Sequence, residues 1–227
     1  MPRLLGDAVG ERLELPALYD DSDRDLARAR EFWKLERGQE FAEPGNPSWE
    51  AFARGDWDES LRLIEGFREG MTRHHQALTA AGTSTYRIRI VSLPPTPYVQ
   101  WELHALRLRD ETGGSTRVLL DTAVADLEDE GPLPNIQTMD RFVMYQPIYD
   151  ASGVGESGVR YIDKALVSRC RDFIADLYAR GEPLADFFRR EIAPLPPPRL
   201  PGPPLPRDSQ ERSALLRTDF IERGKAR

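Results

Sequence analysis

Residues 83–121 place the strongest constraint on the fold, because a strand pattern, a helix pattern and a second strand pattern follow one another there. Residues 85–92 alternate arginine with β-branched and other apolar residues, which is typical of a strand. Thr96 followed by Pro97 is a favourable start for a helix, and a glycine pair after that helix leads into a second strand over 116–120. This alternation predicts an α/β domain with at least one parallel pair of strands, although an α+β arrangement is also compatible.

The sequence beyond this unit predicts a hairpin and two more helices. Apolar runs over 138–149 and 157–162 flank a turn-rich Asp-Ala-Ser-Gly segment, so we expect them to pair. Asp163 is a suitable cap for a helix that extends to Arg180, and a shorter helix follows Pro183. Together these elements predict a small mixed sheet.

The N-terminal third predicts a helical layer beside that sheet. We expect residues 1–30 to form an appendage and residues 31–192 to form the α/β domain. Apolar residues over 26–37 have mostly helical spacing, which predicts a helix there. Residues 58–81 predict one long helix, with Gly70 as the place where it could break.

The C-terminal end has a different composition from the rest of the chain. Eight prolines occur within residues 193–207, which excludes a helix or a central strand and predicts an extended proline-rich linker. Apolar residues recur beyond this linker, so we expect a short amphipathic helix over 208–227.

Charge and composition exclude several classes of protein. The formal net charge of -7 argues against direct binding of nucleic acid or of an anionic membrane surface. No apolar run approaches the roughly 20 residues that span a bilayer, so we expect no membrane partner and a cytoplasmic location. The single cysteine, Cys170, excludes an internal disulfide framework, and its place on an apolar helix stripe predicts a core residue.

The sequence contains no complete catalytic, metal or cofactor motif. His74 and His75 are adjacent in a predicted helix, so their side chains diverge by about 100° and are expected to form a solvated pair. The glycines around Gly153 join two strands and do not open a helix, so the context of a dinucleotide-binding loop is missing. We therefore expect no catalytic residue, no metal and no cofactor.

A group of residues in the strand–helix–strand unit forms the candidate ligand-binding site. Arg87 and Arg89 are two residues apart and share one face of the first strand. If that face is open, their guanidinium groups form a strip suited to an anion; if it is covered, they pair with nearby carboxylates. The other candidates lie on the helix that follows, and they are Tyr98, Trp101, Glu102 and His104.

Several short motifs occur together along the chain: FWKLERGQEF over residues 32–41, PSWEAF over 47–52 and RIRIVS over 87–92. With this set, which extends over about residues 30–190, the chain resembles the actinobacterial domain-of-unknown-function family 6879. The resemblance implies no activity. Genes of this family often neighbour helix-turn-helix regulators, so membership implies a regulatory accessory role by association alone.

The core also resembles, more distantly, one half of a phospholipase-D-like fold. The nucleophile of that superfamily requires a His-x-Lys pair, and no histidine of this chain is followed two residues later by lysine. Phosphodiester hydrolysis by that mechanism is therefore excluded.

These features favour a non-catalytic regulatory or interaction protein that binds a protein partner or a small anionic ligand. We expect the partner to be a helix-turn-helix regulator or a second copy of the chain. The alternative is an enzyme of a specialised, secondary-metabolite pathway with a pocket around Arg87, Arg89, Glu102 and His104. The enzyme requires these four side chains to converge on one accessible site.

Overall fold

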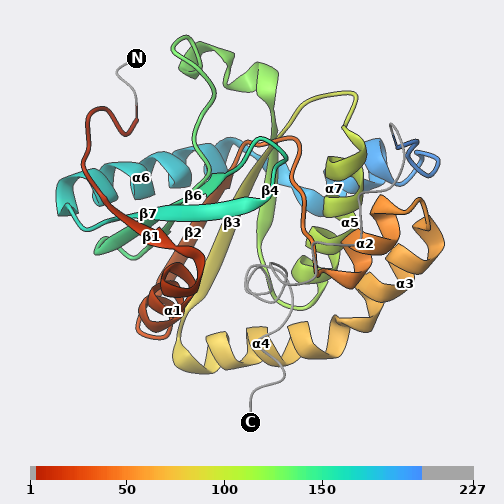
Figure 1. Cartoon of the computed structure of the whole chain (residues 1–227), viewed down its shortest axis with the longest axis horizontal. Coiled ribbons are helices and arrows are strands. Elements are labelled where there is room, and N and C mark those ends of the chain that lie inside the picture. The colour runs from red at the N-terminus through yellow and green to blue at the C-terminus, as the bar shows by residue number, and fades with distance from the viewer. Residues whose placement is uncertain (1–3, 201–227) are drawn as a thin grey trace.

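The computed structural model describes residues 4–200, which form an α/β fold built on an eight-stranded mixed sheet (Figure 1). The strand order across the sheet is β1-β7-β6-β5-β2-β3-β4-β8. The pairs β2–β3 and β3–β4 are parallel and the remaining pairs are antiparallel. The strands are β1 (Glu11–Glu14), β2 (Glu31–Glu36), β3 (Ser84–Val91), β4 (Thr116–Leu120), β5 (Ile136–Met139), β6 (Val143–Tyr149), β7 (Gly155–Tyr161) and β8 (Glu182–Pro183).

Helices cover both faces of this sheet. The α-helices are α1 (Leu15–Leu26), α2 (Pro47–Ala53), α3 (Trp57–Gly66), α4 (Arg68–Ala81), α5 (Pro97–Glu111), α6 (Lys164–Arg180) and α7 (Leu184–Phe187). Two short 3₁₀ turns, η1 (Asp121–Ala123) and η2 (Ala125–Leu127), follow β4, and one π turn, η3 (Phe188–Ile192), extends α7.

The predicted strand–helix–strand unit is confirmed, because α5 connects the parallel strands β3 and β4. Thr96 begins α5 as expected, and its Oγ1 accepts a hydrogen bond from the Val99 backbone N–H at 3.1 Å. Asp163 caps α6 in the same way and accepts from the Leu166 N–H at 2.7 Å. The predicted hairpin is also confirmed by the antiparallel pairing of β6 with β7.

The helix expected over residues 26–37 is wrong, because residues 31–36 form β2 in the middle of the sheet. This strand is buried on both faces, so its apolar residues do not alternate with polar ones. Trp33 and Leu35 pack in the cluster that includes α6, whereas Phe32 packs in the cluster beneath α1. The resulting run of neighbouring apolar residues fits helical spacing as well as it fits a central strand.

The N-terminal segment is part of the sheet and its cover, which differs from the appendage expected over residues 1–30. Residues of β1 pair with β7, and α1 then crosses the sheet (Figure 1). Gly158 of β7 permits this close packing, since a Cβ there would come within 2.6 Å of a Leu18 methyl carbon.

The long helix expected over residues 58–81 is divided into α3 and α4, and the break lies at Phe67 instead of Gly70. Phe67 ends one helix and begins the next, and its side chain packs against the apolar cluster of α2, α3 and α5. The break thus falls where a partly buried aromatic side chain contacts this cluster. Gly70 remains inside α4 with open space where a Cβ would lie.

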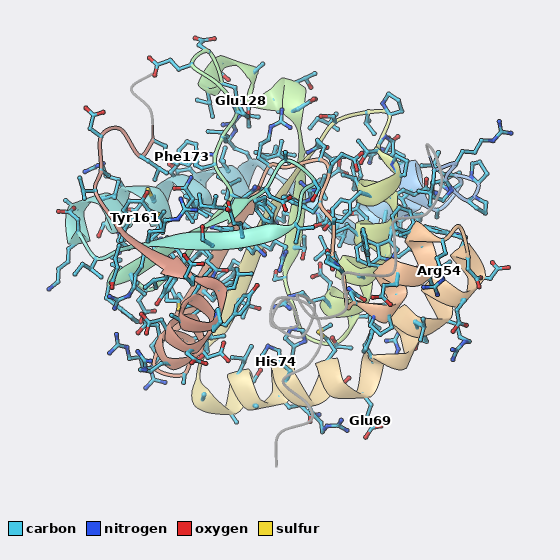
Figure 2. The ribbon with its side chains drawn as sticks, in the orientation of Figure 1. Arg54, Glu69, His74, Glu128, Tyr161 and Phe173 are labelled. Carbon is cyan, nitrogen blue, oxygen red and sulfur yellow. The ribbon has the colours of Figure 1, made fainter. Side chains whose placement is uncertain are left out.

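The two faces of the sheet are covered by different groups of helices. On one face, α6 packs across the central strands, and Cys170 lies fully buried there, as predicted for a core residue. Phe173 on α6 and Tyr161 at the end of β7 both belong to this layer (Figure 2). The other face is shared between α1, over β5–β7, and the helices α2, α3, α5 and α7, which gather at the right of Figure 1.

The beginning of the proline-rich segment contacts the domain. The Gln100 side-chain amide donates a hydrogen bond to the Pro196 carbonyl oxygen at 2.8 Å, and Leu200 packs against the helical cluster. The rest of the expected linker and the helix expected over 208–227 lie outside the described residues.

Replacing Leu35 by alanine tests the placement of β2, because Leu35 is fully buried between β2 and α6. We expect the free energy of unfolding to fall by about 2–5 kcal/mol, as for other buried leucines. The matched control is Val9→Ala, since Val9 is 95% exposed and its replacement should change stability by less than about 0.5 kcal/mol. Urea denaturation measures the free energy of unfolding of both variants. A Leu35→Ala variant as stable as Val9→Ala would contradict the placement of β2 as a buried central strand.

Candidate functional site

The register of the central strands collects charged side chains on the face opposite α6. Lys34 of β2 lies beside Arg87 of β3, and Glu36 lies beside Arg89. Alternate residues of a strand point to the same face, so these four side chains form a compact group. Glu102, from α5, completes the group by pairing with Arg89 near the C-terminal end of β3.

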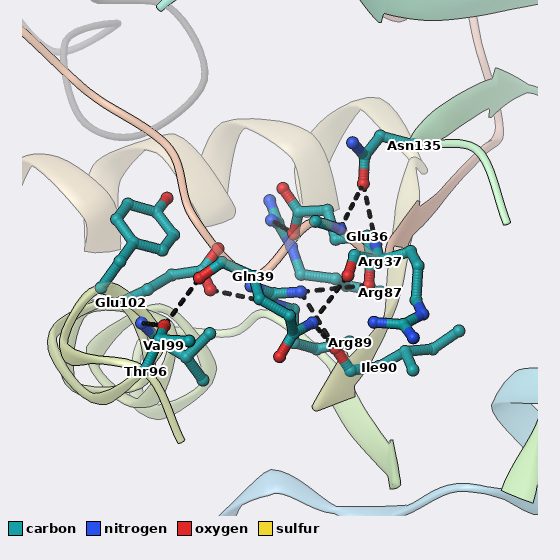
Figure 3. Close-up of polar contacts among 12 residues, drawn as sticks. Glu36, Arg37, Gln39, Arg87, Arg89, Ile90, Thr96, Val99, Glu102 and Asn135 are labelled. Carbon is teal, nitrogen blue, oxygen red and sulfur yellow. Dashed lines mark hydrogen bonds and ion pairs between the residues drawn. The ribbon is translucent and has the colours of Figure 1, made fainter. Parts of the chain in front are cut away.

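These five side chains form two groups of buried ion pairs, and a hydrogen bond from the Arg89 NH1 group to the Glu36 backbone carbonyl oxygen at 3.3 Å joins the groups into one network. Figure 3 shows Glu36, Arg87, Arg89 and Glu102 of this network. The Lys34 ammonium lies 2.8 Å from Glu36 Oε1, and the Arg87 guanidinium pairs with the other carboxylate oxygen of Glu36. Arg89 Nε donates to Glu102 Oε2 at 2.7 Å, and its NH1 group donates to the Ile90 carbonyl oxygen at 3.0 Å. The side chains of Arg89 and Glu102 are both 0% exposed.

The network keeps Glu36 ionised despite its burial. Burial alone would raise the pKa of this carboxyl group, but the charges of Arg87 and Lys34 outweigh that effect. The pKa of Glu36 is therefore held below its ordinary value, and the carboxylate stays negative across the physiological pH range.

The loop over residues 37–46 connects the network to the surface, and side-chain amides hold it in place (Figure 3). Asn135 Oδ1 accepts from the Arg37 backbone N–H at 2.7 Å. Gln39 donates to the Ile90 carbonyl oxygen at 2.8 Å and accepts from the Ser92 N–H at 2.9 Å. Further along, the loop pairs with the β6–β7 turn, where the Ala42 N–H donates to the Gly153 carbonyl oxygen at 3.0 Å.

A cavity of about 90 Å³ lies beside the charged network. Its wall comes from α1, β2, this loop, the start of α5, and the β5, β6 and β7 strands, so elements far apart in sequence enclose it. The polar side chains on the wall include Tyr19, Ser22, Asp23, Lys34, Glu36, Glu43, Tyr98, Gln137 and Tyr145.

Glu43 is the lining residue with the most unusual ionisation. Burial raises its pKa to about 7, and the nearby carboxylates of Glu102 and Glu36 act in the same direction. Two hydrogen bonds oppose the shift: Tyr98 Oη donates to Glu43 Oε1 at 2.7 Å, and Asn46 Nδ2 donates to Oε2 at 2.8 Å. Glu43 therefore exchanges a proton near neutral pH inside the cavity.

The structure brings four of the six sequence-predicted site residues together. Arg87, Arg89 and Glu102 are in the charged network, and Tyr98 lies one turn from Glu102 on α5 and donates to Glu43. Tyr98 and Glu102 are four residues apart, which places them on the same face of α5.

Trp101 and His104 lie away from this group. Trp101 is fully buried, stacks on Phe52 with ring centroids 5.8 Å apart and donates to Ser48 Oγ at 3.0 Å. His104 lies between Trp57 and Phe188, and burial, followed by the charge of Arg107, lowers its pKa to about 4. Their positions on α5 turn both side chains into the helical layer, so the pocket expected around His104 does not form.

The arginine strip is covered, so the two guanidinium groups pair with carboxylates instead of facing solvent. The solvated histidine pair is also wrong in part, because His75 is buried and its Nδ1 lies 3.1 Å from Thr112 Oγ1. Burial, with the charge of Arg109, lowers the pKa of His75 to about 4. His74 lies beside it on α4 and is partly accessible (Figure 2).

Sequence reasoning missed Lys34, Glu36 and Glu43. The first two lie in the segment that was predicted to be a helix, where a lysine and a glutamate two residues apart would diverge. In a strand the same spacing brings them to one face, so the correct secondary structure was the missing information. Glu43 lies in a loop, and its burial depends on segments that its own sequence does not specify.

The fold and the cavity beside its charged network define a small α/β protein with a candidate ligand site between sheet and helices. The chain matches the family described as Domain of unknown function (DUF6879) over residues 22–189, and it belongs to that family. A search of curated proteins found no match.

Two further features concern residues 4–200, the part of the chain that the structure describes. None of the helices there is long and apolar enough to cross a membrane. The same residues contain no cluster of three or more histidine, cysteine, aspartate or glutamate side chains placed to hold a metal ion.

Removing one member of the Arg89–Glu102 pair should lower the free energy of unfolding much more than removing both members. Arg89→Met leaves the Glu102 carboxylate buried without its cation, which should cost about 3–5 kcal/mol of unfolding free energy. The double variant Arg89→Met/Glu102→Leu should recover at least half of that loss. Arg62→Ala is the control, because its pair with Glu59 is exposed. Additive losses in a double-mutant cycle would contradict the coupling.

Glu43→Gln should make stability less dependent on pH. Because the folded-state pKa of Glu43 is raised from 4.5 to about 7, the folded state binds more protons between these values, and the wild type loses stability as pH rises through them. The variant lacks this loss and should be more stable than the wild type above pH 7 by about 3 kcal/mol. At a pH below about 4.5 the difference should vanish.

Thermal or urea denaturation across this pH range measures the effect. Glu130→Gln is the matched control, since Glu130 is exposed and outside the cavity. A stability difference that stays constant with pH would show that Glu43 does not titrate as described.

Proposed function

We propose that this protein is a non-catalytic binding protein that holds a small ligand in the cavity between α1 and the sheet. The observation that carries the proposal is a partly open cavity whose wall combines apolar surface with polar side chains, and whose Lys34 and Glu36 charges are already paired. Lys34 and Arg87 share the Glu36 carboxylate, and this shared pairing restrains the side chains that form the floor. A polar wall that is ordered before binding favours recognition of a ligand, because little ordering remains to be done.

The arginine pair gives no support to a small anionic ligand. The guanidinium groups of Arg87 and Arg89 are engaged by Glu36 and Glu102, and neither arginine is among the described residues that line the cavity. The ligand is therefore recognised by the groups of the cavity wall.

A regulatory role in the cytoplasm belongs to the same proposal. Five residues of α1 line the cavity, so a bound ligand contacts this helix directly. The opposite side of α1 is exposed at Asp20 and Arg24, and this side is available to a protein partner. A helix-turn-helix regulator or a second copy of the chain would sense the ligand through α1.

An enzyme of a specialised pathway is the second candidate, and one observation favours it. Glu43 combines a pKa of about 7 with a position on the cavity wall, which suits a general acid or base. The two candidates differ in the fate of the bound molecule. A binding protein releases that molecule unchanged, whereas an enzyme releases a product that Glu43→Gln no longer forms.

Native mass spectrometry of the full chain purified from its own host tests the proposal. We expect a stoichiometric small-molecule adduct that is lost in Ser22→Trp, because Ser22 lies on α1 at the cavity wall and an indole there occupies the space. Asp20→Trp is the matched control, since Asp20 is exposed on the same helix. An adduct that survives in Ser22→Trp, or a wild type without any adduct, would contradict binding in this cavity. Circular dichroism melting shows that both variants are folded.

A further inference from the structure

We infer that the cavity binds a small organic cation of the alkylammonium class, with its charged nitrogen against the Glu43 carboxylate and the neighbouring aromatic rings. This inference rests on the proposed function, and it adds the chemical class of the ligand. It is carried by the charges, the aromatic side chains and the size of the cavity.

The charges of the wall favour a cation over an anion. Three carboxyl side chains line the cavity, from Asp23, Glu36 and Glu43, and they come from three different segments of the chain. Lys34 is the basic residue among the described lining residues, and its ammonium group is engaged by Glu36 at 2.8 Å. The carboxylates would therefore repel an anion, and the one lysine is already paired. A cation, in contrast, can donate hydrogen bonds to the carboxylate oxygens.

Glu43 has the capacity to accept a ligand. One of its oxygens accepts from Tyr98 and the other accepts from Asn46, but each carboxylate oxygen has two lone pairs. Both carboxylate oxygens of Glu36, in contrast, are held by Lys34 and Arg87. Of Glu36 and Glu43, Glu43 is therefore the one that an ammonium N–H reaches with less disturbance of the network.

Aromatic rings gather beside Glu43. The Phe41 ring centroid lies 4.5 Å from that of Tyr149 and 5.4 Å from that of Tyr98, and all three residues line the cavity. Aromatic faces attract organic cations through their quadrupoles, and groups of such rings recur where alkylated ammonium groups are bound. A carboxylate next to an aromatic cluster is thus suited to an ammonium that carries an alkyl group.

A further lining residue leaves a polar atom unused. Ser157 is 1% exposed, and its Oγ has no hydrogen-bond partner among the described residues. A buried hydroxyl without a partner is unfavourable, so this atom favours a state in which a molecule occupies the space beside it.

The size of the cavity limits the ligand to a small head group. A cavity of roughly 150 Å³ accommodates benzene, with six heavy atoms, so the present volume of about 90 Å³ suits about four. Leu15, Pro147 and Ile148 also line the cavity and are only partly buried, so an alkyl chain can contact them on its way out. These dimensions fit a short primary amine better than a sugar or a nucleotide.

The ionisation of Glu43 makes binding dependent on pH. A permanently protonated ammonium binds the ionised carboxylate more tightly than the neutral acid, so affinity should rise with pH across the pKa of about 7. Tyr98 and Glu102 of α5 and Glu36 of β2 act on the Glu43 carboxyl group. The other titratable or charged residues of the cavity wall are Tyr19 and Asp23 of α1, Lys34 of β2, and Tyr145 and Tyr149 of β6.

The test compares three probes of similar shape by calorimetric or NMR titration of the full chain: propylammonium, propan-1-ol and propionate. We expect propylammonium to bind about tenfold more tightly than propan-1-ol at pH 8, and propionate to be the weakest. Glu43→Gln should weaken propylammonium binding about tenfold at pH 8 and have little effect at pH 6. Glu40→Gln is the matched control, because Glu40 is exposed in the same loop and does not line the cavity.

The outcomes separate this inference from the proposed function. Equal affinity for propylammonium and propan-1-ol, preference for propionate, or absence of binding by all three probes would overturn the cation class. The native mass spectrum of the wild type and of Ser22→Trp decides independently whether the cavity holds any ligand. If the native adduct is present but propylammonium binds unchanged to Glu43→Gln at pH 8, the cavity binds a ligand and the inferred role of Glu43 is wrong.

Discussion

The network of buried ion pairs at the centre of the sheet is the interaction on which the rest of the structure depends. Charges of Glu36, Lys34 and Arg87 lie where an α/β protein ordinarily packs apolar side chains. Taking such charges out of water is costly, so each must keep a partner in good geometry. Because these partners come from β2, β3 and α5, the network fixes the register of the parallel strands and the position of α5 over them.

The same network forms part of the wall of the cavity. Apolar clusters form on either side, one beneath α1 and the other around α5. The loop over 37–46 covers the remaining gap and carries Phe41 and Glu43 to it. The cavity is thus lined by the ion-paired Lys34 and Glu36 and by further carboxyl and aromatic side chains, and these groups favour an alkylammonium ligand.

Local patterns predicted those parts of the fold that depend on neighbours in sequence. The strand–helix–strand unit, the caps at Thr96 and Asp163 and the β6–β7 hairpin are determined by turn and cap residues next to the elements themselves. The segment that became β2 was misassigned because burial on both faces removes the alternation that marks a strand. That single error also hid Lys34 and Glu36, two of the five side chains of the charged network.

The sequence by itself determined the α/β class, the family and the residues of β3 and α5 that supply Arg87, Arg89, Tyr98 and Glu102. Only the tertiary structure decided that the arginines are paired and buried, that Trp101 and His104 face the helical layer, and that Glu43 joins the site. The physical reason is that cap and turn preferences act over a few residues, whereas burial and ion pairing depend on which distant segments cover a face. Glu36 and Glu102 meet the arginines across 51 and 13 residues of chain, and no local pattern specifies such a meeting.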